Sequence, residues 1–291
     1  MFHSLEEIVT SARHMEEPLW KVIQKEDAGE EGISTDASFA RMKQMYQAMK
    51  ESVTDYEPDV RSSSGMAGGN AQLVHERLKE GKMISGDFIG MVMESALACA
   101  EGNACMKRIV AAPTAGSCGV LPAVLLSIQK KEGFTDEKMT EALYVSGGIG
   151  GVIARKASLA GASGGCQAEI GSASGMAAGA LVYLMDGSPE QVMNACAIAI
   201  KGLLGLVCDP VAGLVEVPCV KRNVIGAVNA VTSADMALAG VKSVIPPDEV
   251  IEAMKTVGNA LPESLRETGK GGLAATKTGI AIAEMLKKKS D

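Results

Sequence analysis

Three cysteines lie in turns where their thiols could carry out chemistry. Cys208 and Cys219 stand eleven positions apart in CDPVAGLVEVPC; Pro210 follows the first within two residues and Pro218 directly precedes the second. Because proline lacks a backbone donor and disfavours helical geometry in the residue before it, both thiols are expected on loops or at helix ends. Cys166 lies in a Gly-rich turn, GASGGCQAEIG. Three thiols on turns favour a metal or cluster site over disulfides.

A cubane iron–sulfur cluster held by three protein thiolates would leave one iron open, and an open iron can act as a Lewis acid. The spacing alone is not specific, because no Cys-x-x-Cys occurs in the sequence. Cys99, Cys105 and Cys196 lie in apolar or helical runs, where a free cysteine is usually a small buried apolar residue. Cys118 lies in a Gly/Ser turn and could be near a site.

Other candidate chemistry is sparse. The three histidines, His3, His14 and His75, lie outside the Gly-rich turns, so neither a histidine-based triad nor a zinc site is predicted. His75 is expected to be a solvated surface residue. Glu169 follows Cys166 by three positions in an otherwise uncharged stretch. A carboxylate there is either a paired structural ion or an acid/base with a perturbed pKa.

Two turns are candidates for binding a carboxylate or phosphate. The first, RSSSGMAGGN at 61–70, precedes a predicted helix and would offer hydroxyls, backbone N–H groups and a helix N-terminus. Its alternative interpretation is a flexible surface loop that ends in an asparagine cap. The second is the turn 114–119, TAGSCG. The candidate substrate-binding residues from these turns are Ser62, Ser63, Ser64, Gly65 and Thr114.

The composition limits the class of protein. The 291 residues are 47% apolar but only 3% aromatic, so small aliphatic residues must build the core. A net charge of −7 argues against nucleic-acid binding. Seven cysteines without a signal peptide indicate a reducing cytoplasm. The uncharged run 109–129 is long enough to span a membrane, but its two prolines and its Gly/Ser turn argue against insertion.

The elements that would position these residues are mostly helices. We expect one compact, mostly α catalytic domain over 1–291, with the site formed by Gly-rich turns within about 62–274. A run with four glycines in five positions, 147–151, would be either a tightly packed helix or a break that lines a site. Short strands are possible at 109–112 and 213–217, and 25–33 is expected to be a surface connection. The expected helices are 4–24, 36–52, 71–82, 85–103, 120–129, 135–157, 170–185, 189–207, 224–239, 248–257 and a last one ending in three lysines.

Four segments together resemble a known family. They are PTAGSCGVLPAVL at 113–125, ASLAGASGGCQAEIGSASGMAAGAL at 157–181, CDPVAGLVEVPCVKRN at 208–223 and RETGKGGLA at 266–274. In this order they resemble the alpha chain of the two-chain, iron–sulfur-dependent bacterial L-serine dehydratases. The resemblance implies a helical catalytic domain that holds a [4Fe–4S] cluster through Cys166, Cys208 and Cys219. The implied reaction converts L-serine to pyruvate and ammonia, with the serine hydroxyl leaving from the open iron.

Two departures from the family pattern are informative. Single-chain members carry a Ser-His-Thr motif whose histidine is a candidate base, and this sequence has none. The base is therefore expected from a separate beta chain in a hetero-oligomer. Some relatives end in a cysteine that takes the fourth iron position, whereas this chain ends Lys-Lys-Lys-Ser-Asp, which implies an open iron.

Three alternatives stay open from the sequence. A cluster-dependent lyase could act on cysteine or threonine, and an iron–sulfur protein of this kind could lack catalysis. A pyridoxal-phosphate eliminase performs the same overall reaction, and GASGG at 161–165 imitates its phosphate-binding turn, with Lys156 nearby. The alternating strands and helices that this third class requires are not predicted here.

Overall fold

The computed structural model describes residues 2–290, and the regular elements within that range are all helical, as predicted. The short strands that were possible at 109–112 and 213–217 do not form: the first segment is irregular and the second is a turn. An isolated bridge pairs Cys208 with Arg266. The helices are α1 Leu5–Met15, α2 Leu19–Glu31, α3 Thr35–Thr54, α4 Asn70–Lys79, α5 Gly86–Ala104, α6 Val120–Glu132, α7 Asp136–Lys156, α8 Gly161–Gly164, α9 Ser172–Leu184, α10 Pro189–Gly202, α11 Cys219–Leu238, α12 Pro247–Ala260 and α13 Lys277–Ser290. Short turns are η1 Ala115–Ser117, the π-helical turn η2 Gln167–Gly171, η3 Val211–Gly213, η4 Glu263–Leu265 and η5 Gly272–Ala275.

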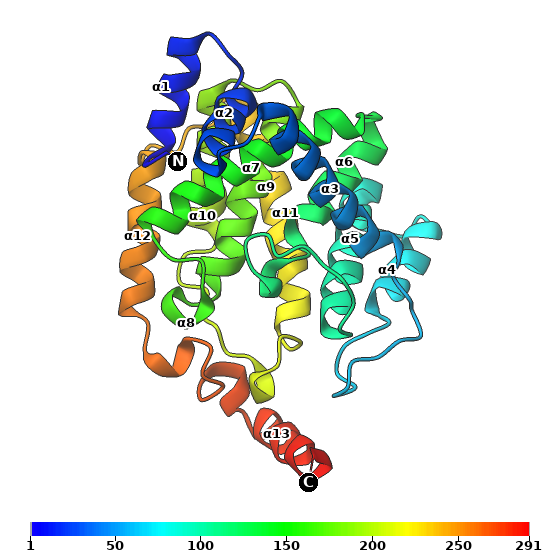
Figure 1. Cartoon of the computed structure of the whole chain (residues 1–291). Helices are drawn as coiled ribbons and strands as arrows, with labels where there is room; N and C mark the ends of the chain where they lie inside the picture. The colour runs from blue at the N-terminus through cyan, green and yellow to red at the C-terminus, as the bar shows by residue number, and fades with distance from the viewer. Residues whose placement is uncertain (1, 291) are drawn as a thin grey trace.

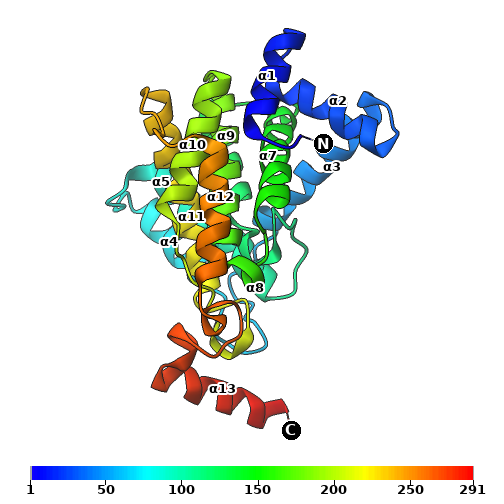
Figure 2. The ribbon, with the colours of Figure 1, turned by 90° about the vertical axis from the view of Figure 1, so that its left-hand side faces the viewer.

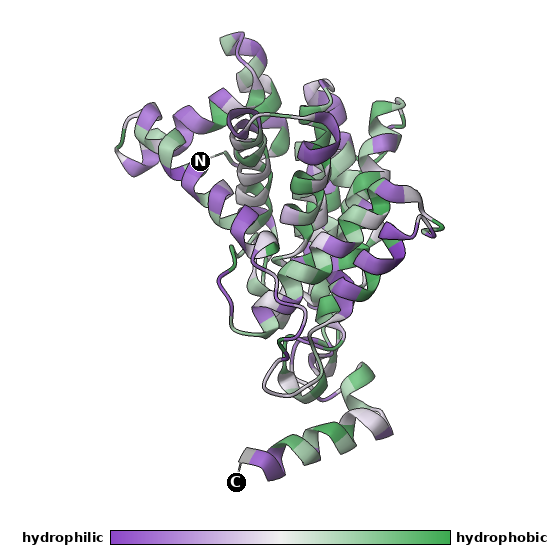
Figure 3. Ribbon diagram, turned by 90° about the vertical axis from the view of Figure 1, so that its right-hand side faces the viewer, coloured by the Kyte–Doolittle hydropathy of each residue, from purple (hydrophilic) through white to green (hydrophobic). Residues whose placement is uncertain are grey.

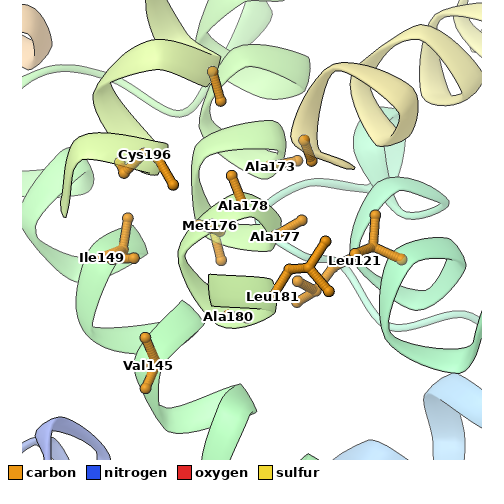
Figure 4. Packing of buried hydrophobic residues seen from close by; sticks show 14 of the residues in the cluster. Leu121, Val145, Ile149, Ala173, Met176, Ala177, Ala178, Ala180, Leu181 and Cys196 are labelled. Carbon is orange, nitrogen blue, oxygen red and sulfur yellow. The ribbon is translucent and has the colours of Figure 1, made fainter. Parts of the chain in front are cut away.

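The centre of the bundle is α9, which packs against α6, α7, α10 and α11 (Figures 1 and 4). Its sequence, SASGMAAGALVYL, is mostly Gly, Ala and Ser, and all its residues but Tyr183 are buried. The small residues let neighbouring backbones approach: a methyl group on Gly179 would lie 2.3 Å from Ile149 Cδ1. Close packing of this kind is how a chain poor in aromatic residues fills its interior.

The glycine-rich run in α7 remains helical throughout. A methyl group on Gly148 would lie 2.6 Å from Ile23 Cδ1, and one on Gly150 would lie 3.0 Å from Met176 Cε. These glycines therefore allow α2 and α9 to contact α7 closely, which offsets their low helix propensity. Of the two interpretations, the tightly packed helix is correct.

Several helix limits differ from the sequence prediction. The expected helix 4–24 is split, because Glu16 adopts φ 53° and Pro18 precedes the first residue of α2. The expected surface connection 25–33 is wrong, since α2 continues to Glu31 and ends at Gly32. Buried Ala28 keeps this polar stretch on the bundle. At the other end, α10 stops at 202 rather than 207, and α11 starts at Cys219 rather than at 224.

The turns that hold the candidate residues gather at one end of the bundle, the lower end in Figures 1 and 2, near α8. Beyond this end, α13 extends away from the bundle, with its main contacts to η3 and η5 (Figure 2). Apolar residues occur along α13 and throughout the bundle helices (Figure 3). Within 2–290, no helix is both long and apolar enough to cross a membrane.

Candidate active site

Each of the three turn cysteines is presented by a helix end or an extended segment, as the prolines and glycines predict. Cys166 follows Gly165, which has φ 72°, and directly precedes η2. Cys208 lies in the segment after α10, and Cys219 is the first residue of α11. All three are nearly buried, with 3%, 3% and 9% of their surfaces exposed.

Backbone hydrogen bonds join the turns to one another. The Cys208 N–H donates to Leu265 O at 2.9 Å, and the Glu267 N–H donates to Cys208 O at 2.8 Å. The Gln167 N–H donates to Leu206 O at 2.9 Å, and the Gln167 side chain accepts from the Gly205 N–H at 2.9 Å. The Cys166 turn, the Cys208 segment and the 265–267 turn are thereby held side by side.

The thiols are close enough to influence one another's ionisation. Burial raises the pKa of Cys166 to about 12 and that of Cys219 to about 11, and both are raised further by the Glu169 carboxylate. Burial also raises the pKa of Cys208, and the Cys166 and Cys219 thiols and Glu169 raise it further. The Arg222 guanidinium opposes these effects at Cys166 and Cys219. The three thiols and Glu169 therefore form one electrostatic unit.

Glu169 is the acidic group at the centre of this unit. Its Oε1 accepts a hydrogen bond from Thr114 Oγ1 at 2.7 Å, and its Oε2 lies 3.9 Å from Cys208 Sγ. A methyl group on Gly161 would lie 2.7 Å from Glu169 Oε2, 3.0 Å from Cys208 Sγ and 3.1 Å from Glu267 Oε2. Burial raises the pKa of Glu169, and Glu267 raises it further, while Thr114 lowers it. Of the two sequence interpretations, the perturbed carboxyl describes Glu169 better than a paired ion.

The donor set is of the kind that holds an iron–sulfur group. Thiolates are the usual ligands of iron–sulfur clusters. Among residues 2–290, no three His, Cys, Asp or Glu side chains are arranged to hold one metal ion.

Arg222 supplies positive charge beside two of the thiols, Cys166 and Cys219. Arg222 Nη1 donates to Val207 O at 2.8 Å, and its Nη2 lies 2.8 Å from Asp209 Oδ1. Arg266, which is bridged to Cys208, has a buried Nε without a hydrogen-bond partner within the described chain. An unsatisfied buried donor on a residue that is bridged to Cys208 is compatible with a negatively charged group such as a thiolate-held cluster.

The Ser/Gly loop is tied to buried carboxylates that the sequence analysis did not single out. Ser62 Oγ and Ser64 Oγ donate to Glu216 Oε2 at 2.7 and 2.6 Å, whereas Ser63 is exposed. Gly65 has φ 81°, which a glycine accommodates without strain. Of the five candidate substrate-binding residues, Thr114 donates to Glu169, which contacts Cys208. The Ser62 and Ser64 hydroxyls are instead bonded to buried Glu216.

The N-terminus of α4 does bind a carboxylate, but it is the protein's own Glu101. This side chain is fully buried and accepts hydrogen bonds from the Gly68, Asn70 and Ala71 N–H groups at 3.0–3.2 Å, and from the Tyr56 hydroxyl at 2.7 Å. The flexible loop with an asparagine cap is wrong, because the loop is anchored and Gly69, not Asn70, precedes the first helical residue. The signal in the sequence is a single acid within the small-residue run ALACAEGNA.

The remaining candidate residues have other surroundings, although Cys118 shares its turn with Thr114. Cys99 and Cys118 are buried in contact with each other's carbonyls, and Cys196 is in the core. His75 Nδ1 lies 3.0 Å from Glu94 Oε1. Lys156, the candidate for the pyridoxal alternative, is paired with Glu252 at 2.8 Å on α12, which raises its pKa. A charged, ion-paired lysine does not suit a Schiff base.

Comparison with known proteins agrees with the resemblance found in the sequence. The family model for the serine dehydratase alpha chain matches residues 12–274. A probable L-serine dehydratase alpha chain of Bacillus subtilis is 46% identical over 98% of this chain and 95% of its own length. The L-serine dehydratase alpha chain of Peptoniphilus asaccharolyticus is 51% identical over 78% of this chain and 77% of its own. An L-serine dehydratase of Escherichia coli is 45% identical over 65% of this chain but only 41% of its own length. This chain therefore belongs to the serine dehydratase alpha chain family.

Proposed function

We propose that this chain is the catalytic alpha chain of an iron–sulfur-dependent L-serine dehydratase, which converts L-serine to pyruvate and ammonia. The relatives named for this reaction support the substrate and reaction class. The observation that carries the cofactor assignment is the gathering of three buried thiols by separate turns. The reaction removes water from serine, and hydrolysis of the resulting aminoacrylate gives the two products.

Cys166, Cys208 and Cys219 are the residues that would hold a [4Fe–4S] cluster. When bound, the cluster supplies a Lewis acid at its open iron for the departing hydroxide. Arg222 offsets negative charge at Cys166 and Cys219, which favours the deprotonated form that ligation requires. Burial of the thiols keeps bulk water from this part of the site.

The substrate subsite is assigned to Thr114 and the Ser62–Gly65 loop, with Ser63 as the serine hydroxyl left free for substrate. Ser63 borders a cavity of about 900 Å³ with Thr268 and Gly269, next to η3. Ser62 and Ser64 position the loop, because their hydroxyls are bonded to Glu216. A substrate carboxylate placed against that acid would be repelled, so it is expected on the Ser63 side.

The general base comes from a beta chain in this proposal. The Escherichia coli relative extends well beyond the segment that it shares with this chain, whereas the Bacillus subtilis alpha chain matches over nearly its full length. This contrast supports a division of the single-chain enzyme into two polypeptides. The base must reach the serine Cα–H within hydrogen-bond distance, which places the beta chain over the turn-bearing end of the bundle.

The test is pyruvate formation from L-serine after anaerobic reconstitution with iron and sulfide. The alpha chain is assayed alone and with its cognate beta chain, beside L-threonine and L-cysteine as competing substrates. We expect activity only from the pair and the highest kcat/KM for L-serine. Full activity of the lone chain would refute the beta-chain assignment, and a preference for another substrate would refute serine. A pair that binds iron without turnover would refute catalysis.

A further inference from the structure

A second cavity lies on the bundle among α3, α4, α5 and α6, and none of the seven cysteines borders it. Its volume is about 510 Å³, within the range of pockets that hold small organic ligands. We call it the α3–α6 groove. Each of the four helices contributes side chains spaced three positions apart, which places them on the groove face of that helix. These pairs are Lys50 and Val53, Gln72 and His75, Met91 and Glu94, and Ser127 and Lys130.

One side of the groove suits a carboxylate. Ser127 borders the groove and is 2% exposed, and its buried Oγ has no hydrogen-bond partner in the described chain. A buried hydroxyl without a hydrogen-bond partner is energetically unfavourable, so a ligand that accepts a hydrogen bond from it would remove that penalty. Lys130, one turn along the same face of α6, has no ion-pair partner among residues 2–290. Lys50, by contrast, is already paired with Asp136 at 3.1 Å.

A different side chain suits an ammonium group. Glu94 borders the groove on α5 and contacts the His75 ring at 3.0 Å, which leaves its second oxygen for another donor. The groove therefore holds a basic and an acidic group on separate helices. Val53, Met91 and Leu126 line it with apolar surface. A ligand that complements all three features carries a carboxylate, an ammonium group and an apolar side chain.

We propose that the α3–α6 groove binds an α-amino acid with an apolar side chain, with its carboxylate at Lys130 and Ser127 and its ammonium group at Glu94. The site is separate from the cysteine turns, and the inference does not depend on the proposed function. Tyr56 also borders the groove, and its hydroxyl donates to Glu101, which holds the start of α4. An occupant of the groove would thus contact Tyr56, which is hydrogen-bonded to the glutamate that anchors the Ser/Gly loop.

The test is isothermal titration of the full chain with L-leucine and L-methionine. We expect saturable binding of one ligand per chain, in the metal-free and the reconstituted protein alike. Two fragments of leucine separate the contributions: 4-methylpentanoate lacks the ammonium group and 3-methylbutylamine lacks the carboxylate. Both should bind at least about tenfold more weakly than L-leucine, since each loses a charged contact.

Matched substitutions locate the site. Lys130→Met should weaken L-leucine binding about tenfold, and Glu94→Gln should do the same, as expected for loss of one charged hydrogen bond. Lys131→Met is the control, because Lys131 lies over the Phe88 ring and does not border the groove. Absence of saturable binding by both amino acids would overturn the proposal. So would equal effects of the Lys130 and Lys131 changes, or fragments that bind as tightly as L-leucine.

Discussion

Two Gly-rich regions of this chain each surround a buried glutamate, yet they shift its pKa in opposite directions. At the Ser/Gly loop, Glu101 accepts from three backbone N–H groups, the Asn70 amide and the Tyr56 hydroxyl. Burial acts to raise its pKa, but the hydrogen bonds outweigh burial and the pKa is lowered. At the cysteine turns, Glu169 has one hydroxyl donor and one thiol neighbour, and burial leaves its pKa raised.

We infer that the difference distinguishes a structural carboxylate, Glu101, from one placed for chemistry, Glu169. A fully bonded buried charge stabilises the fold around it and has no lone pair left for a ligand. A buried acid with few donors is unfavourable in its charged form and is typical of functional sites. Similar turn sequences therefore do not imply similar roles; the number of donors facing the acid decides between them.

The largest effect is expected at the thiols. Cys208→Ser should lose the bound iron and reduce kcat by about 10³-fold or more, because the Lewis-acid contribution of several kcal/mol disappears. Cys105→Ser is the control, since Cys105 caps the end of α5 and is not among the proposed ligands. Iron content and pyruvate formation measure both. Equal iron binding by Cys208→Ser and the control would remove Cys208 from the ligand set.

The two glutamates should separate stability from activity. Glu101→Gln should lower the free energy of unfolding by about 3 kcal/mol, because several buried donors lose their charged acceptor. Glu169→Gln should change it by about 1 kcal/mol or less in metal-free protein, while kcat falls about 10²-fold. Urea unfolding and steady-state kinetics test the pair. A larger loss of stability for Glu169→Gln than for Glu101→Gln would reverse the comparison.

The stabilising effect of Glu101 should depend on pH in a defined direction. Its pKa is lowered on folding, so its contribution is present above the ordinary glutamate pKa of about 4.3 and is lost as pH falls through the folded value. The difference in unfolding free energy between wild type and Glu101→Gln should accordingly shrink with acidification. A difference that stays constant from neutral pH down to acid would contradict the assigned shift.

The smallest effects should distinguish the serines of the loop. Ser64→Ala should lower the free energy of unfolding by about 1 kcal/mol, because it removes a hydrogen bond to buried Glu216. Ser63→Ala should leave stability unchanged and raise KM for L-serine about fivefold, since Ser63 is exposed at the cavity. Thermal unfolding and KM are measured for both variants. Equal KM effects would mean that Ser63 has no separate role.

Much of the site was predictable from local sequence. The prolines beside Cys208 and Cys219 and the glycines before Cys166 placed all three thiols at turns and helix ends, which the structure confirms. The predominance of helix followed from the scarcity of alternating patterns. The predicted helix limits were less accurate where the last turns of a helix are mostly polar, as in α2. They were also less accurate where a helix begins inside a proline-containing turn, as in α11.

The acids that hold the loops were not predictable in the same way. Glu101 lies 30 or more sequence positions from the N–H groups that donate hydrogen bonds to it. Glu216 lies more than 150 sequence positions from the Ser62 and Ser64 hydroxyls. Local sequence patterns predict which residues share a helix face, but not which distant turn those residues will contact in the fold. Each acid does stand alone in an apolar stretch, and that isolation is the only local sign of its burial.

The most direct test of the account is anaerobic measurement of iron and sulfide with a visible spectrum, before and after addition of L-serine. The account predicts about four irons and four sulfides per chain, as a [4Fe–4S] cluster requires, and a change in the spectrum when serine binds at the open iron. A chain that takes up no iron even with its beta chain would contradict the cluster assignment. A cluster whose spectrum shows four thiolate ligands and does not respond to L-serine would contradict the open iron.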